Sequence, residues 1–508
     1  MKKKVLYALI IVVSYFLPGA CIDDKTSTFK IDGSPIVISV QDSVFHLDFG
    51  NPLVITPEVS QKIKDLPLKY EWRCIATDGD SGSDSLRFIS FEKEFRYSFP
   101  RAGSFQIRLR VENQYGSSFK YFIANVEAPF EKGILILSND EQDNSRISFL
   151  RLKEEEELLD AETSDFNTNA FLQSNPEVAL RGARDVIFTR TGELSSGPRH
   201  YVLAVSSESD QKIYFLNGRY FLIENMLNVG DFIPNTYPTV LCGNGDHMMT
   251  EIMFGTNDRN GVPGDYGFVS IRSFFVYLAE TSGSYDKIIL GEENLGFFVN
   301  YLGCFVDNSR SEVYVVRQGT YKYTCENRFA GMNIVNVVFA DNIGTMMFVT
   351  TDKNDPQQIS IHKTGTRSSW ENNLVMFEST PYTYAINGDL TLTSDCKMLA
   401  NRKYQYIYYN QGNKLYRWSY MVQEPKLPSE PDLILDDPDD EITCMEMSPN
   451  QEHLWVCVYN RNAKTELKGK LLIINPVTLQ IEKTINGISD RALKVMWKPT
   501  KFNEDYVF

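Results

Sequence analysis

The residue best suited to a chemical role near the start of the chain is Cys21, whose thiol follows Gly19 and Ala20. Three lysines open the chain and are followed by an apolar run that ends at Leu17. This run is too short to span a bilayer, which needs roughly 20 residues. Small residues directly before a cysteine suit a signal peptidase, so the pattern predicts a signal peptide over residues 1–20. Lipidation of the Cys21 thiol would then anchor the chain, since each buried CH₂ contributes about 0.8 kcal/mol.

The sequence before Cys21 resembles a bacterial lipobox, with one departure at Pro18, where leucine is usual. Asp23 and Asp24 resemble the acidic export signal that sends lipoproteins of Bacteroidota to the outer face of the outer membrane. The resemblance implies a lipid-anchored, surface-exposed protein with a polar tether over residues 21–33. The alternatives are an ordinary secretory signal with a chance cysteine, and a tether whose acidic residues serve only solvation.

Metal-binding and catalytic patterns are sparse. Asp78, Asp80 and Asp84 lie in a glycine-rich loop and offer carboxylate oxygens that suit Ca²⁺. Their spacing departs from that of a calcium loop and no bidentate glutamate follows, so a plain hairpin loop is the favoured interpretation. Asp246 and His247 suit either a pocket wall or a turn that enters a strand. We therefore expect no metal site and no cofactor.

The five histidines include no HxH or HxxxH pair, and the chain has no GxSxG, P-loop or dinucleotide-binding motif. The 66 acidic residues leave a glycosidase-like carboxylate pair open, although nothing marks one pair out. Tyrosines at 321–323 and 404–409 suit aromatic platforms for a ligand, or strand positions in a core. These observations favour a non-enzymatic protein.

Composition indicates a globular, β-rich chain of several domains. Its 508 residues exceed what one core organises, and its 27 tyrosines and 32 phenylalanines favour strands. The net charge of −15 argues against a nucleic-acid partner, because such binding needs a basic face. The cysteines other than Cys21 are scattered and odd in number, which predicts small buried hydrophobic residues and no disulfide framework.

Residues 34–128 show the period-2 alternation of strands with one buried face. The clearest strand places two sets of side chains on opposite faces: Phe105, Ile107, Leu109 and Val111 against Gln106, Arg108 and Arg110. Residues 70–72, the turn at 100–103 and the segment 111–116 resemble a PKD domain. This resemblance implies an immunoglobulin-like β-sandwich that serves as a spacer or a protein-contact module.

Residues 132–508 consist of short strands separated by glycine, asparagine, aspartate and serine, and residues 175–184 suit a short helix. Among the expected strands, 301–306 opens one unit and 374–377 is the fourth strand of another. Strands expected at 442–449, 453–460, 469–476 and 480–485 are in the order of one β-propeller blade, and similar units lie upstream. Ala492–Pro499 matches a first strand and Gly133–Asn139 a second strand that lacks its first. We expect the last strand to complete the first blade of a roughly seven-bladed propeller. An array of β-sandwiches is the alternative.

The order of lipobox, PKD-like domain and propeller-like region resembles the PKD-like family lipoproteins of Bacteroidota. The resemblance implies a non-catalytic binding or scaffold role beside a TonB-dependent importer and its capture lipoprotein, with a glycan or peptide as ligand. A glycan- or peptide-processing enzyme on the same scaffold and a cell-surface adhesin are the alternatives. The identity of the ligand does not follow from the sequence.

Overall fold

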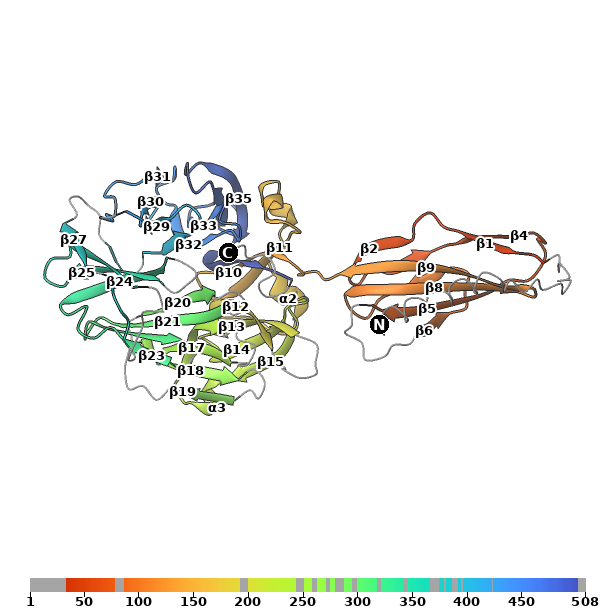
Figure 1. The fold of residues 1–508 in the computed structure, drawn as a ribbon, viewed down its shortest axis with the longest axis horizontal. Coiled ribbons are helices and arrows are strands. Elements are labelled where there is room, and N and C mark those ends of the chain that lie inside the picture. Colours follow the sequence, from red (N-terminus) through yellow and green to blue (C-terminus); the bar gives the residue numbers. More distant parts are fainter. Residues whose placement is uncertain are drawn as a thin grey trace, which may run out of the picture. The chain divides into compact units, whose positions relative to one another are not determined.

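The chain divides into two compact units, residues 1–127 and 128–508, in its computed structural model (Figure 1). The structure describes residues 33–77, 86–191, 200–243, 251–257, 263–270, 275–278, 287–294, 299–317, 321–340, 345–365, 374–378, 381–385, 392–393, 396–422 and 424–500. It is nearly all β. The helices of these residues are short: η1 (Glu155–Leu159), η2 (Thr163–Asp165), α2 (Ala170–Ser174) and α3 (Val229–Phe232). None of the described helices has the length and apolar character needed to cross a membrane.

Unit 1 is built on a five-stranded sheet in the order β2-β9-β8-β5-β6. Its strands are β2 (Val44–Asp48), β9 (Gly116–Glu127), β8 (Gly103–Asn113), β5 (Lys69–Ala76) and β6 (Arg87–Ser90). β2 runs parallel to β9, and the other neighbours are antiparallel. Two smaller sheets pair β1 (Ile36–Ser39) with β4 (Glu58–Gln61), and β3 (Leu53–Ile55) with β7 (Phe95–Tyr97).

The core of unit 1 lies on one face of the five-stranded sheet. The predicted alternation of β8 is confirmed, because its four odd-numbered apolar residues from Phe105 to Val111 are buried while the residues between them are not. Trp72 of β5 is fully buried, with its ring centroid 4.9 Å from that of Phe95 on β7. Its indole Nε1 donates a hydrogen bond to the Glu92 carbonyl at 3.0 Å. The core therefore joins the five-stranded sheet to β3 and β7.

The described part of unit 2 contains seven sheets, six of four strands and one of three. The first four comprise β11 (Ser145–Arg151), β10 (Gly133–Asn139) and β36 (Arg491–Lys498); β12 (Ala183–Thr191), β13 (His200–Ser207), β14 (Lys212–Asn217) and β15 (Ile223–Asn228); β16 (Tyr237–Gly243), β17 (Glu251–Asn257), β18 (Pro263–Ser270) and β19 (Phe275–Leu278); and β20 (Lys287–Asn294), β21 (Val299–Asp307), β22 (Glu312–Arg317) and β23 (Tyr321–Thr324). The other three comprise β24 (Met332–Phe339), β25 (Met346–Asp352), β26 (Gln358–Lys363) and β27 (Tyr382–Ala385); β28 (Met398–Asn401), β29 (Tyr406–Gln411), β30 (Lys414–Ser419) and β31 (Leu433–Ile434); and β32 (Glu441–Met447), β33 (Leu454–Tyr459), β34 (Gly469–Ile474) and β35 (Ile481–Ser489).

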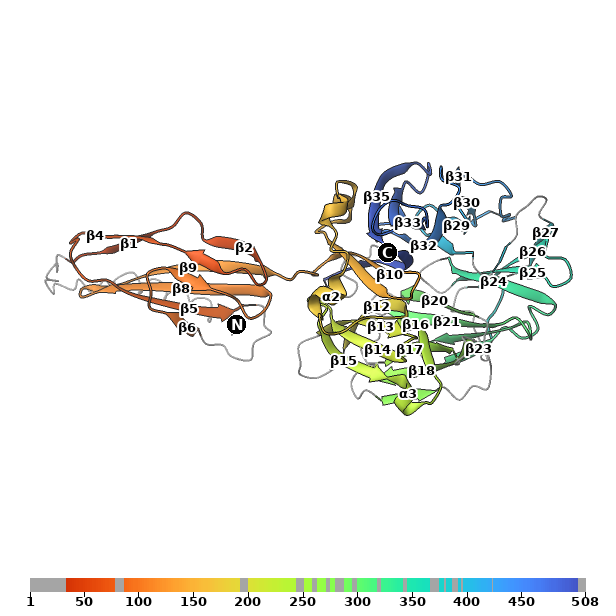
Figure 2. The same cartoon turned by 180° about the vertical axis from the view of Figure 1, so that it is seen from behind.

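Most successive sheets of unit 2 meet through the strand at one end of each sheet, and one junction also involves the second strand β21. β12 contacts β36 and β16, β16 contacts β21, β20 contacts β24, β24 contacts β28, and β28 contacts β32, which contacts β36. Figures 1 and 2 show these sheets fanning out around a common centre, which is a propeller-like arrangement. β36 pairs antiparallel with β10, so the predicted pairing of the last strand with the first strand of this region is confirmed.

Polar side chains near the ends of second strands connect one sheet to the next. Asn139 Nδ2 donates to the Ala183 carbonyl at 3.0 Å, and Asn410 Nδ2 donates to the Ile442 carbonyl at 3.0 Å. Asn308, directly after β21, makes the same kind of contact with the Ile334 carbonyl at 3.2 Å. A buried hydrogen bond of this kind contributes about 1 kcal/mol and costs more if one partner is left unpaired. The repeated contact therefore helps to set the position of neighbouring sheets at three junctions of unit 2.

Some expected elements differ from the structure. A helix expected over 175–184 is wrong, because α2 ends at Ser174 and Arg184 lies in β12, where it pairs with Asp143 and Glu208. Pro176 disfavours helical geometry at Asn175, which explains the early end. A fourth strand expected at 374–377 is also wrong, since β27 takes that place. A strand expected at 301–306 to open its sheet lies second, behind β20.

Candidate functional site

The residues predicted to carry lipid, export and calcium functions lie outside the described part of the structure. These are Cys21, Asp23 and Asp24 near the start of the chain, and Asp78, Asp80 and Asp84 in the loop after β5. The loop that holds Asp246 and His247 lies outside it as well. The predictions about these residues therefore stay predictions.

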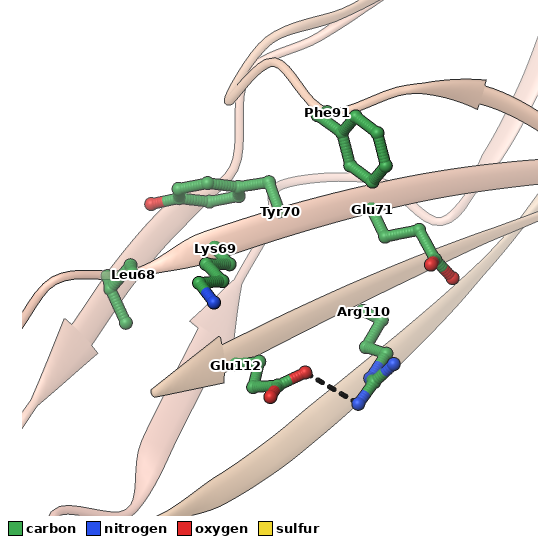
Figure 3. Close-up of a pocket in the computed structure, with 7 residues that line it drawn as sticks. All are labelled: Leu68, Lys69, Tyr70, Glu71, Phe91, Arg110 and Glu112. Atoms are coloured by element: carbon green, nitrogen blue, oxygen red, sulfur yellow. Dashed lines mark ion pairs between the residues drawn. The ribbon is translucent and has the colours of Figure 1, made fainter. Parts of the chain in front are cut away.

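An open pocket of about 380 Å³ lies on unit 1, on β5 and β8 and the segment after β6 (Figure 3). Figure 3 shows Lys69 and Glu71 on one strand and Arg110 and Glu112 on the next, with Phe91 on the other side of the Glu71 strand. The residues that line the pocket are Leu68, Lys69, Tyr70, Glu71, Phe91, Arg110 and Glu112.

Strand register gathers the charged residues of this region on one face. In the antiparallel pairing of β5 with β8, Glu71 lies opposite Arg110 and Arg73 lies opposite Arg108. Side chains of a strand alternate between faces, and Trp72, between Glu71 and Arg73, enters the core. The charged residues consequently lie on the face of the sheet that points away from the core.

Ion pairs organise these side chains. Glu71 Oε1 lies 2.9 Å from Arg73 Nε and 3.2 Å from Arg108 Nη2, so one carboxylate is shared by two guanidinium groups. Arg110 Nη2 lies 2.5 Å from Glu112 Oε2. The hydrogen bond from Arg73 lowers the pKa of Glu71, and the charges of Arg73, Arg108 and Arg110 lower it further. Glu71 is therefore held ionised between the arginines.

Arg108 retains unused hydrogen-bonding capacity. Its Nε atom is buried and has no hydrogen-bond partner, and its guanidinium carbon lies 5.6 Å from the centroid of the Phe119 ring. An arginine carries five N–H donors in a planar fork that matches a carboxylate. The Arg108 side chain is 21% exposed, and a further anionic partner can approach this exposed part but not the buried Nε.

Exposed aromatic residues border the arginines on both sides. Phe88 on β6 lies opposite Arg73, and Tyr121 on β9 lies opposite Arg108. The side chains of Phe88 and Tyr121 are 47% and 52% exposed, and Phe91 is 68% exposed with its ring centroid 4.4 Å from that of Phe88. We call this surface the arginine–aromatic face, which comprises Glu71, Phe88, Phe91, Arg73, Arg108, Arg110, Phe119 and Tyr121.

Sequence reasoning found only part of this face. It placed Arg108 and Arg110 away from the core, which is confirmed, but it did not single out Phe88, Phe119 or Tyr121. The available signal was the alternation of β9, in which Phe122 is buried while Phe119 and Tyr121 are exposed. Exposed aromatic residues that cluster on one face indicate an interaction surface more strongly than scattered ones do.

Two of the four tyrosines at 404–409, expected either as platforms or as core, lie in the core. Tyr408 and Tyr409 are fully buried, and their hydroxyls donate to the carbonyls of Pro476 and Pro428. Tyr404 is partly exposed, and its hydroxyl donates to Glu452 at 2.7 Å. For Tyr408 and Tyr409, the core interpretation is therefore the correct one.

Unit 2 carries two smaller groups of ionisable residues. Lys494 of β36 pairs with Asp185 of β12 at 2.8 Å, which links two first strands. His453 lies between Glu155 and Glu482, with nitrogen–oxygen distances of 3.8 and 3.4 Å. No group of three or more histidine, cysteine or acidic residues with metal-binding geometry occurs among the residues that the structure describes.

The cysteines of the described residues are buried thiols. Cys444 and Cys457 lie opposite each other on β32 and β33, and both are free. Burial raises the pKa of the Cys304 and Cys325 thiols, which keeps them protonated. The expectation of small buried hydrophobic residues is confirmed for the six described free cysteines: Cys74, Cys304, Cys325, Cys396, Cys444 and Cys457.

No protein-family model matches the chain, and no curated protein sequence matches it significantly. Among solved structures, it is similar to a quinoprotein alcohol dehydrogenase-like protein from Bacteroides thetaiotaomicron, with 14% identity, a TM-score of 0.45 and coverage of 91% of this chain and 99% of that one. A putative 6-phosphogluconolactonase from Bacteroides uniformis has 10% identity, a TM-score of 0.40 and coverage of 72% and 99%. A functionally unknown protein from Desulfotomaculum acetoxidans has 11% identity, a TM-score of 0.41 and coverage of 73% and 99%. These similarities assign neither a family nor an activity to the chain.

Proposed function

We propose that this chain is a non-catalytic binding component of the cell surface, tethered to the outer membrane by lipid on Cys21 and directed outward by Asp23 and Asp24. The observation that carries the proposal is the arginine–aromatic face of unit 1. Its side chains offer both charge and apolar area, which suits recognition of a glycan or a peptide.

The architecture supports the same role. In this proposal unit 1 is a PKD-like β-sandwich, since its core joins the five-stranded sheet to β3 and β7. Unit 2 is a seven-bladed propeller, in which the sheet of β10, β11 and β36 is the blade that joins the two ends of the region. A propeller offers a broad face to a protein partner, and here that partner is a TonB-dependent importer with its capture lipoprotein.

The anchor is tested by metabolic labelling with a palmitate analogue in the native host. The wild-type chain is expected to incorporate label and to sediment with outer membranes, whereas Cys21→Ala is expected to do neither. Cys74→Ala is the matched control, because Cys74 is buried in the core of unit 1. Label that persists in Cys21→Ala contradicts the assignment of the lipid to this residue.

The role in uptake is tested by purifying the chain from detergent-solubilised outer membranes and identifying the proteins that accompany it. Importer subunits at a constant ratio to the chain are the expected result. Recovery of the chain alone contradicts the accessory role. Substitution of Asp23 and Asp24 by asparagine should reduce accessibility to protease added to whole cells, because those residues are proposed to direct export.

A further inference from the structure

From its charge and geometry, we infer that the arginine–aromatic face binds an acidic polysaccharide, a glycan whose sugar rings carry carboxylates. The inference rests on the proposed binding function and names the class of its ligand. It commits to a glycan of this kind, and an acidic peptide is treated as a competing outcome of the test.

The charge of the face is opposite to that of the whole chain. The chain carries a net charge of −15, which repels polyanions at long range. On the outward side of β5 and β8, where the arginines lie, basic side chains outnumber carboxylates: Lys69, Arg73, Arg108 and Arg110 against Glu71 and Glu112. A local positive surface on an acidic protein favours a negatively charged ligand at this place.

The guanidinium groups favour carboxylates among anionic ligands. Arg73 and Arg108 share the single carboxylate of Glu71, so their donors exceed the acceptors that the protein supplies. A ligand carboxylate that adds to this pair forms the planar, charge-assisted hydrogen bonds for which arginine is suited.

The aromatic residues favour sugar rings over a peptide. Phe88 and Tyr121 lie on β6 and β9, three strand intervals apart, which corresponds to about 14 Å across the sheet. A polymer that crosses the strands therefore meets an aromatic residue, two arginines and a second aromatic residue in turn. The apolar faces of pyranose rings contact aromatic rings and bury apolar area, while ring carboxylates reach the arginines between them.

The test is calorimetric titration of the full chain, purified in detergent, with three polymers. Polygalacturonate is the probe, its fully methyl-esterified form has the same backbone without charge, and polyglutamate supplies carboxylates on a peptide. We expect polygalacturonate to bind, its affinity to fall as salt is raised, and the other two polymers to bind at least about tenfold more weakly.

Variants locate the binding surface. Arg73→Gln and Arg108→Gln should each weaken polygalacturonate binding by about tenfold, and Tyr121→Ala should weaken it by several-fold. Arg96→Gln is the matched control, because Arg96 is 65% exposed on β7, outside the five-stranded sheet. Thermal melting checks that each variant folds. If Arg108→Gln does not fold, Arg73→Gln still tests the site, because Arg73 is the more exposed of the two arginines.

Each other outcome overturns the inference in a different way. Equal binding of the methyl ester rejects carboxylate recognition but retains the proposed binding function. Equal binding of polyglutamate rejects the glycan as the ligand class. Binding that is unchanged by Arg73→Gln and Tyr121→Ala rejects the site. Absence of binding to all three polymers rejects the inference, whereas the proposed role in uptake is decided separately by co-purification of importer subunits.

Discussion

Lys498 on β36 is a lysine with no exposed surface, and its replacement gives a stability change that depends on pH in a defined direction. Its Nζ donates to the carbonyl of Glu131 at 2.6 Å and to that of Pro499 at 3.2 Å, and it lies 4.8 Å from the centroid of the Phe188 ring. The pKa of Lys498 is lowered from 10.5 to about 7, chiefly by burial, with an opposing contribution from the charge of Glu131 and a smaller lowering by that of Arg219.

The direction of this pH dependence follows from the number of protons that the folded and unfolded chains bind. Between pH 7 and 10.5 the unfolded chain holds a proton on Lys498 that the folded chain has released, so stability rises with pH in this window. The loss of this proton on folding lowers the free energy of unfolding by about 4 kcal/mol at pH 7 and by about 1 kcal/mol at pH 10. Lys498→Met removes this titration and keeps the length of the side chain. Relative to wild type, the variant should lose about 3 kcal/mol of stability between pH 7 and pH 10.

Urea unfolding followed by tryptophan fluorescence measures this difference, because Trp497 adjoins the substituted residue and is itself buried. The comparison of variant with wild type at each pH cancels the contribution of other titrating groups. Lys464→Met, at an exposed lysine, is the control and should follow wild type at every pH. A difference between Lys498→Met and wild type that stays constant from pH 7 to pH 10 would refute the reasoning, since it would mean that Lys498 keeps its proton in the folded chain.

Three other substitutions test both units of the chain. The neighbouring Glu155, whose carboxylate lies 3.8 Å from the imidazole, raises the pKa of His453 above 6.5, so its stabilisation is complete below about pH 6.5 and is lost as pH rises through the folded-state pKa. His453→Gln should therefore be about 1 kcal/mol less stable than wild type at pH 5.5 and nearly equal to it at pH 9, as measured by urea unfolding. Asn410→Ala should lower the free energy of unfolding by about 1–3 kcal/mol, because the Ile442 carbonyl loses its buried donor. Trp72→Ala should destabilise unit 1 by about 3–5 kcal/mol, seen as faster hydrogen exchange in peptides of β5 and β8.

Controls separate these effects from general destabilisation. Asn462→Ala removes an exposed amide and should change stability by less than about 0.5 kcal/mol. Phe88→Ala removes a half-exposed ring from the same sheet as Trp72 and should leave hydrogen exchange in β8 near the wild-type rate. A deficit of His453→Gln that grows with pH would show that the imidazole is not held protonated by its glutamate neighbours.

The sequence predicts strands well where burial alone determines the pattern. All seven residues of β10 are buried, and the strand has the bounds that its apolar run indicates. The pairing of β36 with β10 could also be predicted, because each strand lacked a partner that the repeated order of strands supplies elsewhere. In both cases the local sequence, together with the requirement that every strand be paired, is sufficient to predict the structure.

The arginine–aromatic face could not be predicted in this way. Phe88, Arg73, Arg108 and Tyr121 become neighbours only through the registers of three strand pairs, and a shift of one residue would move a side chain to the core face. Lys498 shows the same difficulty, since a lysine is usually exposed and its burial depends on backbone carbonyls at Glu131 and Pro499.

The pairing of β10 with β36 also constrains the order in which the chain can fold during synthesis. Ser138 on β10 and Asp490, which contact each other, are 352 residues apart, so a ribosome needs roughly 20–70 s to make the second after the first. Over that time one edge of β10 has no partner strand, whereas all the strands of unit 1 are already made. Unit 2 therefore stays incomplete until synthesis of its last strand, and a chaperone that covers the unpaired edge of β10 would protect the nascent chain from aggregation.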